Sequence, residues 1–264
     1  MKVKPVHSLI LLIAIYLLVQ GIAINIGQNF IPKISSGEIQ PAVQNPEAPE
    51  TSGEIFLYVL FITAIMLMLI KFKFGIVIKI LMFFAMFTGM VITLWSFFPE
   101  GWFYIVVPFY ILFLWKRQNI VVSNAALVLT IAGIGGYLGA SLHFIPSLLL
   151  LLLLSVYDIV AVFGTKHMVT LATEAKDKIP MFSLPVKERF LSMGTGDLAI
   201  PSMFTVSVLQ DFSMTHALFT VFGGLVGLMS LFLYILNREK VALPALPPIT
   251  IGLVIGFLLG FLVL

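Results

Sequence analysis

Long apolar runs constrain the fold of this chain more than any other feature. They fall in about nine stretches, at 8–27, 55–70, 74–97, 102–115, 119–140, 144–164, 192–210, 214–236 and 243–264. A helix of about 20 apolar residues spans the hydrocarbon core of a bilayer. Because 60% of the 264 residues are hydrophobic and 10% are charged, too few polar groups remain to cover a water-exposed surface. The sequence predicts one polytopic membrane domain over residues 1–264.

Helices are favoured over strands in these runs. Exposed strands and loops cannot satisfy their backbone groups in lipid, and a membrane β-barrel requires period-two alternation. The unbroken leucines at 148–154 lack that alternation. We therefore expect an all-α integral membrane protein with about nine transmembrane helices.

The basic residues predict the orientation of these helices. With a cytoplasmic N-terminus, fourteen of the 15 Lys and Arg residues fall in or near the cytoplasmic connections and only Lys33 lies outside. This asymmetry follows the positive-inside rule and places the C-terminus outside the cytoplasm. The basic residues behind the net charge of +3 are then explained by the membrane orientation. No nucleic-acid partner is therefore expected.

Two connections are long. Residues 28–54 form a predicted external loop whose four prolines and four glutamates suit an irregular tether. Residues 165–191 form a predicted cytoplasmic loop. The chain has no Cys, which excludes disulfides, thiol nucleophiles and Cys-ligated metals.

Two acidic residues fall inside predicted spans, whereas the other ten lie in connections. Asp158 has apolar neighbours on both sides, and Asp197 follows Gly194-Thr195-Gly196. An acid at the centre of a membrane helix costs about 2.5–3.5 kcal/mol on insertion scales, and such residues usually serve a function.

The predicted depths of these two acids agree. Asp158 lies eight residues before Lys166, and Asp197 lies eight residues after Arg189. Each is then about 12 Å along a helix from a cytoplasmic basic residue. Consecutive antiparallel helices would bring both carboxyl groups to one level.

Two neighbouring carboxyl groups share a proton, so the ionised one can activate water while the protonated one donates to a peptide carbonyl. Peptide hydrolysis is one function that this pair allows. A cation leak or proton-coupled transport through the same acids is the alternative, because intramembrane acids often mark ion pathways.

Irregular backbone is predicted near both acids. Gly194 and Gly196 remove side chains where the backbone approaches another helix or a substrate. Three prolines within Leu243–Pro248 delay a regular helix, which a membrane tolerates only beside protein or water.

These residues together resemble a known family. Tyr157-Asp158, Gly194-Thr195-Gly196-Asp197 and Pro244-Ala245-Leu246 are similar to the YD, GxGD and PAL motifs of the presenilin and signal peptide peptidase family of intramembrane aspartyl proteases. The order and spacing match over the whole chain. The orientation resembles that of presenilin, and the small size resembles archaeal members.

The resemblance implies an aspartic endopeptidase that cleaves transmembrane segments of membrane proteins. Asp158 and Asp197 would be catalytic, and the residues shaping the active site would be Tyr157, Gly194, Thr195, Gly196, Leu198, Pro244, Ala245 and Leu246. The expected partners are transmembrane substrates and the lipid bilayer of a prokaryotic, archaeal cell membrane. No metal, cofactor or accessory subunit is implied, and homo-oligomerisation is left open.

The sequence lacks the motifs of two other classes of intramembrane protease. The four His residues are scattered and form no HExxH motif, so a zinc intramembrane protease is not expected. No GxSG serine motif is present either. The glycines at 252, 256 and 260 and at 223, 224 and 227 predict close helix packing.

Overall fold

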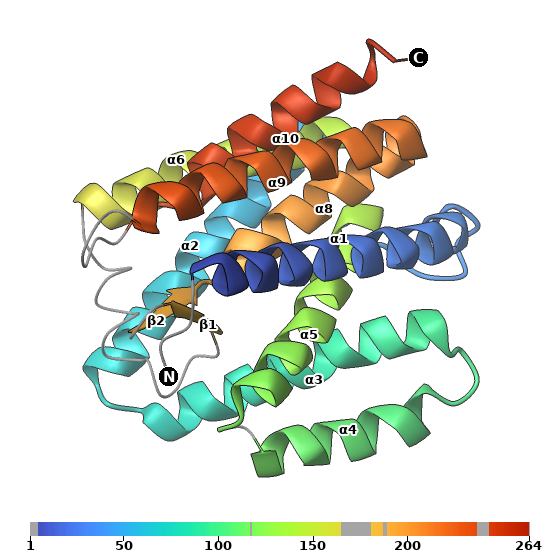
Figure 1. The fold of residues 1–264 in the computed structure, drawn as a ribbon. Helices are drawn as coiled ribbons and strands as arrows, with labels where there is room; N and C mark the ends of the chain where they lie inside the picture. The colour runs from blue at the N-terminus through green and yellow to red at the C-terminus, as the bar shows by residue number, and fades with distance from the viewer. Residues whose placement is uncertain (1–4, 117, 165–180, 187–188, 237–242, 264) are drawn as a thin grey trace.

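The computed structural model describes residues 5–116, 118–164, 181–186, 189–236 and 243–263. Within these ranges the chain folds into nine α-helices (Figure 1), which are α1 Pro5–Ser35, α2 Pro49–Lys71, α3 Gly75–Phe97, α4 Trp102–Lys116, α5 Ile120–Ala140, α6 Phe144–Ile159, α8 Gly196–Asp211, α9 Met214–Leu236 and α10 Leu246–Gly260. A π-helical turn, η1 Val160–Gly164, continues α6. The nine predicted helical segments are therefore present, with different ends.

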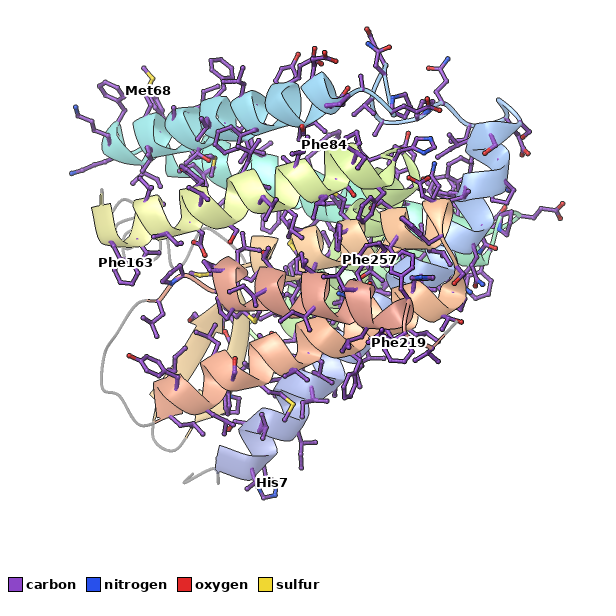
Figure 2. The ribbon with its side chains drawn as sticks, turned by 90° about the horizontal axis from the view of Figure 1, so that it is seen from above. His7, Met68, Phe84, Phe163, Phe219 and Phe257 are labelled. Atoms are coloured by element: carbon purple, nitrogen blue, oxygen red, sulfur yellow. The ribbon has the colours of Figure 1, made fainter. Side chains whose placement is uncertain are left out.

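Six helical segments are long and apolar enough to cross a membrane by length and composition: α1, α2, α3, α5, α6 with η1, and α9. The shorter apolar helices are α4 and α10. Many apolar side chains on the outside of the bundle are exposed, for example Met68 (59%) and Phe163 (58%), which point away from the helices in Figure 2. Such a surface suits lipid, and the chain is an integral membrane protein.

The predicted external loop at 28–54 is shorter than expected. Helix α1 continues to Ser35 and α2 begins at Pro49, so the irregular connection covers residues 36–48. The helix continues beyond the apolar stretch that ends at residue 27, and Asn29 Nδ2 donates to the Ser96 carbonyl at 3.1 Å.

This connection is also held to the helices, which corrects its interpretation as a tether. The Ala42 amide donates to Ser141 Oγ at 2.9 Å, and the Tyr137 hydroxyl donates to the Gln40 carbonyl at 2.8 Å. Both partners lie at the end of α5. The connection therefore packs against the helix bundle.

The predicted all-α fold is incomplete, because strands β1 Phe182–Val186 and β2 Arg189–Met193 form an antiparallel pair. Phe182 and Leu184 are buried, which is the period-two pattern of a strand. Five residues are too few for this pattern to stand out in a sequence. The pair occupies part of the predicted 165–191 loop, of which residues 165–180 and 187–188 lie outside the described ranges.

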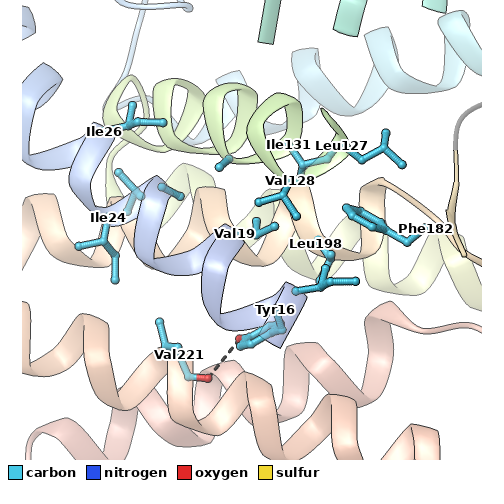
Figure 3. Packing of buried hydrophobic residues seen from close by; sticks show 14 of the residues in the cluster. Tyr16, Val19, Ile24, Ile26, Leu127, Val128, Ile131, Phe182, Leu198 and Val221 are labelled. Carbon is cyan, nitrogen blue, oxygen red and sulfur yellow. Dashed lines mark hydrogen bonds between the residues drawn. The ribbon is translucent and has the colours of Figure 1, made fainter. Parts of the chain in front are cut away.

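The core lies around α5, which packs against α1, α3 and α8. Figure 3 shows Val19 of α1, Leu127 of α5 and Leu198 of α8 within this core. The Tyr16 hydroxyl donates to the Val221 carbonyl at 3.1 Å and joins α1 to α9 (Figure 3). Helix α6, which carries Asp158, packs through Leu150 and Leu154 in a second cluster with Met203 of α8 and Leu246 of α10.

Helices α9 and α10 approach closely through their glycines, as predicted. A Cβ atom added at Gly223 would collide with the carbonyl oxygen of Gly252, and one at Gly256 would collide with that of Phe219. Only glycine permits this backbone contact. The partner of these glycines is therefore a helix of the same chain.

Candidate active site

Helix α6 places Asp158 on its buried face. Asp158 is 6% exposed, and Leu154 and Ser155 are buried beside it, whereas Val156 is 61% exposed. The regular helix ends one residue later and becomes the π-turn η1. Insertions of this kind are common at functional sites, because they redirect side chains locally.

Asp197 lies in the first turn of α8 and is partly exposed. Its Oδ2 accepts a 3.1 Å hydrogen bond from the Gly194 amide. The continuous helix predicted from Arg189 to Asp197 is not formed, because 189–193 form β2 and α8 begins at Gly196. The distance of about 12 Å calculated between these two residues assumed a helix and was therefore wrong.

The start of α10 contacts Asp158. The Leu246 amide donates to Asp158 Oδ2 at 3.1 Å, and the Ala245 amide also interacts with this carboxylate. The first amides of a helix lack partners within the helix, and its N-terminus favours an anion. Pro247 and Pro248 lie at the next two positions, where proline is well tolerated. Asp158 therefore caps α10 from a neighbouring helix.

The fold brings the two acids together. Asp158 and Asp197 lie close enough for their carboxyl groups to interact electrostatically. The predicted residues Pro244, Ala245 and Leu246 are buried next to Asp158. Three segments that are far apart in the sequence thus meet at one site.

The two glycines before Asp197 have different surroundings. A Cβ atom added at Gly194 would lie 3.1 Å from Asp197 Oδ2, whereas one at Gly196 would have no heavy atom within 4 Å. Gly194 therefore gives Asp197 room to accept its hydrogen bond. Gly196 borders open space, so helix packing does not explain this glycine.

The other predicted site residues lie around the acids. Tyr157 packs its ring edge to face against Phe56 of α2, with centroids 6.1 Å apart. Leu198 is 1% exposed and belongs to the core, as Figure 3 shows. The Thr195 carbonyl accepts from the Ala199 amide at 3.0 Å, at the start of α8. Their roles in shaping the site stay predictions.

Sequence reasoning missed polar residues that hold this site in place. Asn124 of α5 uses its side-chain amide to pair with both backbone groups of Ser183, at 3.1 and 3.2 Å. Asp211, which the sequence placed in an external connection, contacts the start of α6. No sequence motif marks either residue. Among the described residues no group of His, Asp and Glu side chains is arranged to hold a metal ion.

A helical membrane bundle that brings two aspartates close together beside a proline-rich helix start points to one class of protein. The sequence model described as "Signal-peptide peptidase, presenilin aspartyl protease" matches residues 13–191. This range contains Asp158 and ends before Asp197. A comparison with curated proteins finds no match.

Two solved structures are similar to the whole chain. A presenilin family intramembrane aspartate protease, solved in space group C222, has a TM-score of 0.71 and 25% identity, covering 97% of this chain and 99% of that one. A structure of such a protease in space group P2 has a TM-score of 0.66 and 25% identity, covering 96% of each chain.

The chain belongs to the signal peptide peptidase and presenilin family of aspartyl proteases. It is accordingly an aspartic endopeptidase of the membrane-embedded class. The comparisons give no support to the alternative of a cation leak or transporter.

Proposed function

We propose that this protein hydrolyses peptide bonds within transmembrane segments of membrane proteins, with Asp158 and Asp197 as the catalytic pair. One observation carries the proposal: the carboxyl groups of Asp158 and Asp197 lie close enough to interact electrostatically, and each accepts a backbone amide on one oxygen. The GxGD and PAL segments supply those two amides.

The mechanism needs one proton shared between the two carboxyl groups. The ionised carboxylate takes a proton from water as the water oxygen attacks the carbonyl carbon of the scissile bond. The protonated carboxyl donates its proton to the carbonyl oxygen, giving a neutral tetrahedral diol. The diol then returns a proton through the pair to the amide nitrogen, and the C–N bond breaks to leave a carboxyl and an amine.

Backbone donors restrict how the carboxyl groups can move. The Leu246 amide fixes one oxygen of Asp158, and the Gly194 amide fixes one oxygen of Asp197. Donors that are positioned before the reaction need no reorganisation during it.

The open side of the site lies along Ser192, Gly196 and Asp197. Ser192 and Gly196 are exposed and Asp197 is partly exposed, whereas Asp158 is buried. Water and a substrate backbone therefore reach the pair from the side of β2 and the start of α8. We infer that this side faces the cytoplasm, with the N-terminus inside and the C-terminus outside, as the basic residues predict.

The β pair offers an edge for an unwound substrate. Ser183 of β1 directs its N–H and C=O to Asn124, so its pair with Ser192 is one without hydrogen bonds between the strands. The backbone groups of Ser192 therefore point to the opposite edge. A transmembrane helix must unwind before its amides are cleaved, and strand addition at this edge would hold the unwound segment.

Purified protein incubated in detergent with a panel of single-span peptides tests the proposal. Mass spectrometry in H2¹⁸O is expected to show two products, cut within the apolar segment, with ¹⁸O in the new carboxyl group. No gradient exists in detergent, so transport cannot contribute to the signal. Intact peptides across the panel, or cuts confined to their flanks, would count against intramembrane hydrolysis.

A further inference from the structure

The end of the bundle opposite the β pair holds a polar contact between the two helices that carry the acids. Asp211, the last residue of α8, places Oδ1 2.7 Å from His143 Nδ1 and accepts the Phe144 amide on Oδ2 at 2.6 Å. Phe144 is the first residue of α6. One carboxylate thus joins the end of one helix to the start of the other.

Asp211 performs the capping that α6 cannot provide itself. His143 occupies the N-cap position, but its side chain makes no capping bond. The carboxylate of Asp211 supplies the acceptor and places a negative charge at the helix N-terminus, where it is favourable. The side chains of Asp211 and His143 are only 22% and 34% exposed, so water screens this contact less than it would a surface pair.

The contact divides the two helices into equal arms. Asp158 is the fourteenth residue after Phe144 along α6, and Asp211 is the fourteenth after Asp197 along α8. Each arm is about 21 Å long in an α-helix. Since the helices run antiparallel, fixing their far ends at one point brings Asp158 and Asp197 to the same level.

Further contacts hold the far ends together. The hydroxyls of Ser147 and Ser207 meet in the interface about one turn from Asp211. Phe144 stacks on Phe257 of α10, with ring centroids 4.6 Å apart, and Phe212 contacts both rings. Figure 2 shows Phe257 toward the end of the bundle away from Phe163. The ends of α6 and α8 near Asp211 are therefore held together, whereas the opposite ends carry Asp158 and Asp197.

We propose that Asp211 is a positioning residue that sets the register between α6 and α8, with His143 orienting its carboxylate. The inference rests on the proposed function, since it explains how the catalytic pair is aligned. A slip of one helical turn moves one carboxyl group by about 5.4 Å relative to the other. A displacement of about 1 Å can reduce a rate about 100-fold.

Kinetics of Asp211→Ala in detergent test this role. We expect kcat to fall about 10- to 100-fold with KM within about twofold of the wild type, because substrate contacts stay while the pair is misaligned. Asp211→Asn keeps an acceptor for the Phe144 amide and should retain more activity. Glu47→Gln is the matched control, because Glu47 lies 3.7 Å from His143 but is not on α6 or α8, and it should be unaffected.

An engineered disulfide distinguishes a positioning role of Asp211 from a purely structural one. The chain has no Cys, so Ser147→Cys with Ser207→Cys introduces the only thiol pair, across the same interface. Under oxidising conditions the disulfide is expected to restore kcat to Asp211→Ala, and dithiothreitol should remove the rescue. Wild-type kcat in Asp211→Ala, or lost activity that the disulfide does not restore in folded protein, would overturn the proposal.

The outcomes for the register and for the catalytic pair are distinguishable. If Asp158→Asn still cleaves, the proposed function fails whatever Asp211 does. If cleavage depends on both Asp158 and Asp197 but not on Asp211 or His143→Gln, only the register proposal fails. Melting temperatures of each variant in the same detergent separate misalignment from loss of fold.

Discussion

The backbone amide of Leu246 donates a 3.1 Å hydrogen bond to Oδ2 of Asp158, so the start of α10 holds a carboxyl group of α6. The amide is available because α10 begins at Leu246, after a proline-rich segment. The PAL segment therefore contacts Asp158 through its backbone, and we propose that its prolines set where the helix starts.

Removing this amide should slow the chemistry. Leu246→Pro deletes the donor, and we expect kcat to fall about 10- to 100-fold, the worth of one hydrogen bond to a charged group. Leu246→Ala shortens the side chain but keeps the N–H, so it serves as the matched control. Equal kcat values for the two variants in a peptide-cleavage assay would contradict this role of the backbone.

The glycines of the GxGD motif should respond differently to alanine. In Gly194→Ala the new methyl group lies 3.1 Å from Asp197 Oδ2, so we expect a lower kcat from a displaced carboxyl group. In Gly196→Ala the methyl group meets open space, so the melting temperature should not change while KM rises as substrate is obstructed. A drop in melting temperature for Gly196→Ala alone would argue for a packing role instead.

Asn124 should support the substrate-binding edge. Asn124→Leu removes both hydrogen bonds to Ser183 and leaves two backbone groups of a strand without partners. We expect kcat/KM to fall about tenfold and amide exchange to accelerate in β1, measured by hydrogen–deuterium exchange. Ser123→Ala, one residue earlier on α5, is the control. Equal amide exchange in the two variants would show that the Asn124 side chain does not hold β1 in place.

The pH dependence of cleavage should be bell-shaped. At low pH both Asp158 and Asp197 are protonated and no base activates water; at high pH both are ionised and no acid donates to the carbonyl. The two limbs report the pair as a unit. A rate that rises steadily with pH, measured as kcat/KM on one peptide, would indicate a single base instead.

Much of the fold is predictable because membrane helices depend on apolar length. Helix α9 was predicted at 214–236 and occupies that range. The pairing of β1 with β2 was not predicted because strands of five residues leave little pattern in a sequence, although the backbone near 180–193 was expected to accept a substrate strand. The end of α1 was placed too early because the apolar run stops at residue 27, whereas the helix continues through Asn29, which pairs with Ser96 across the bundle.

The candidate site was likewise only partly predictable from the sequence. Asp158 and Asp197 stand out because a carboxyl group is rare in an apolar run, and this rarity is visible without a structure. Asp211 and Asn124 act through long-range contacts with Phe144 and Ser183. Neither residue is unusual for its sequence position, so only the packed structure reveals what each one holds.

Single substitutions of the two acids test whether Asp158 and Asp197 form the catalytic pair. Asp158→Asn and Asp197→Asn keep the size of each side chain but remove the proton that the pair shares. We expect each variant, folded with a wild-type melting temperature, to cleave a purified single-span peptide at least about 1,000-fold more slowly than the wild type. Cleavage by either variant at a rate near that of the wild type would rule out Asp158 and Asp197 as the catalytic pair.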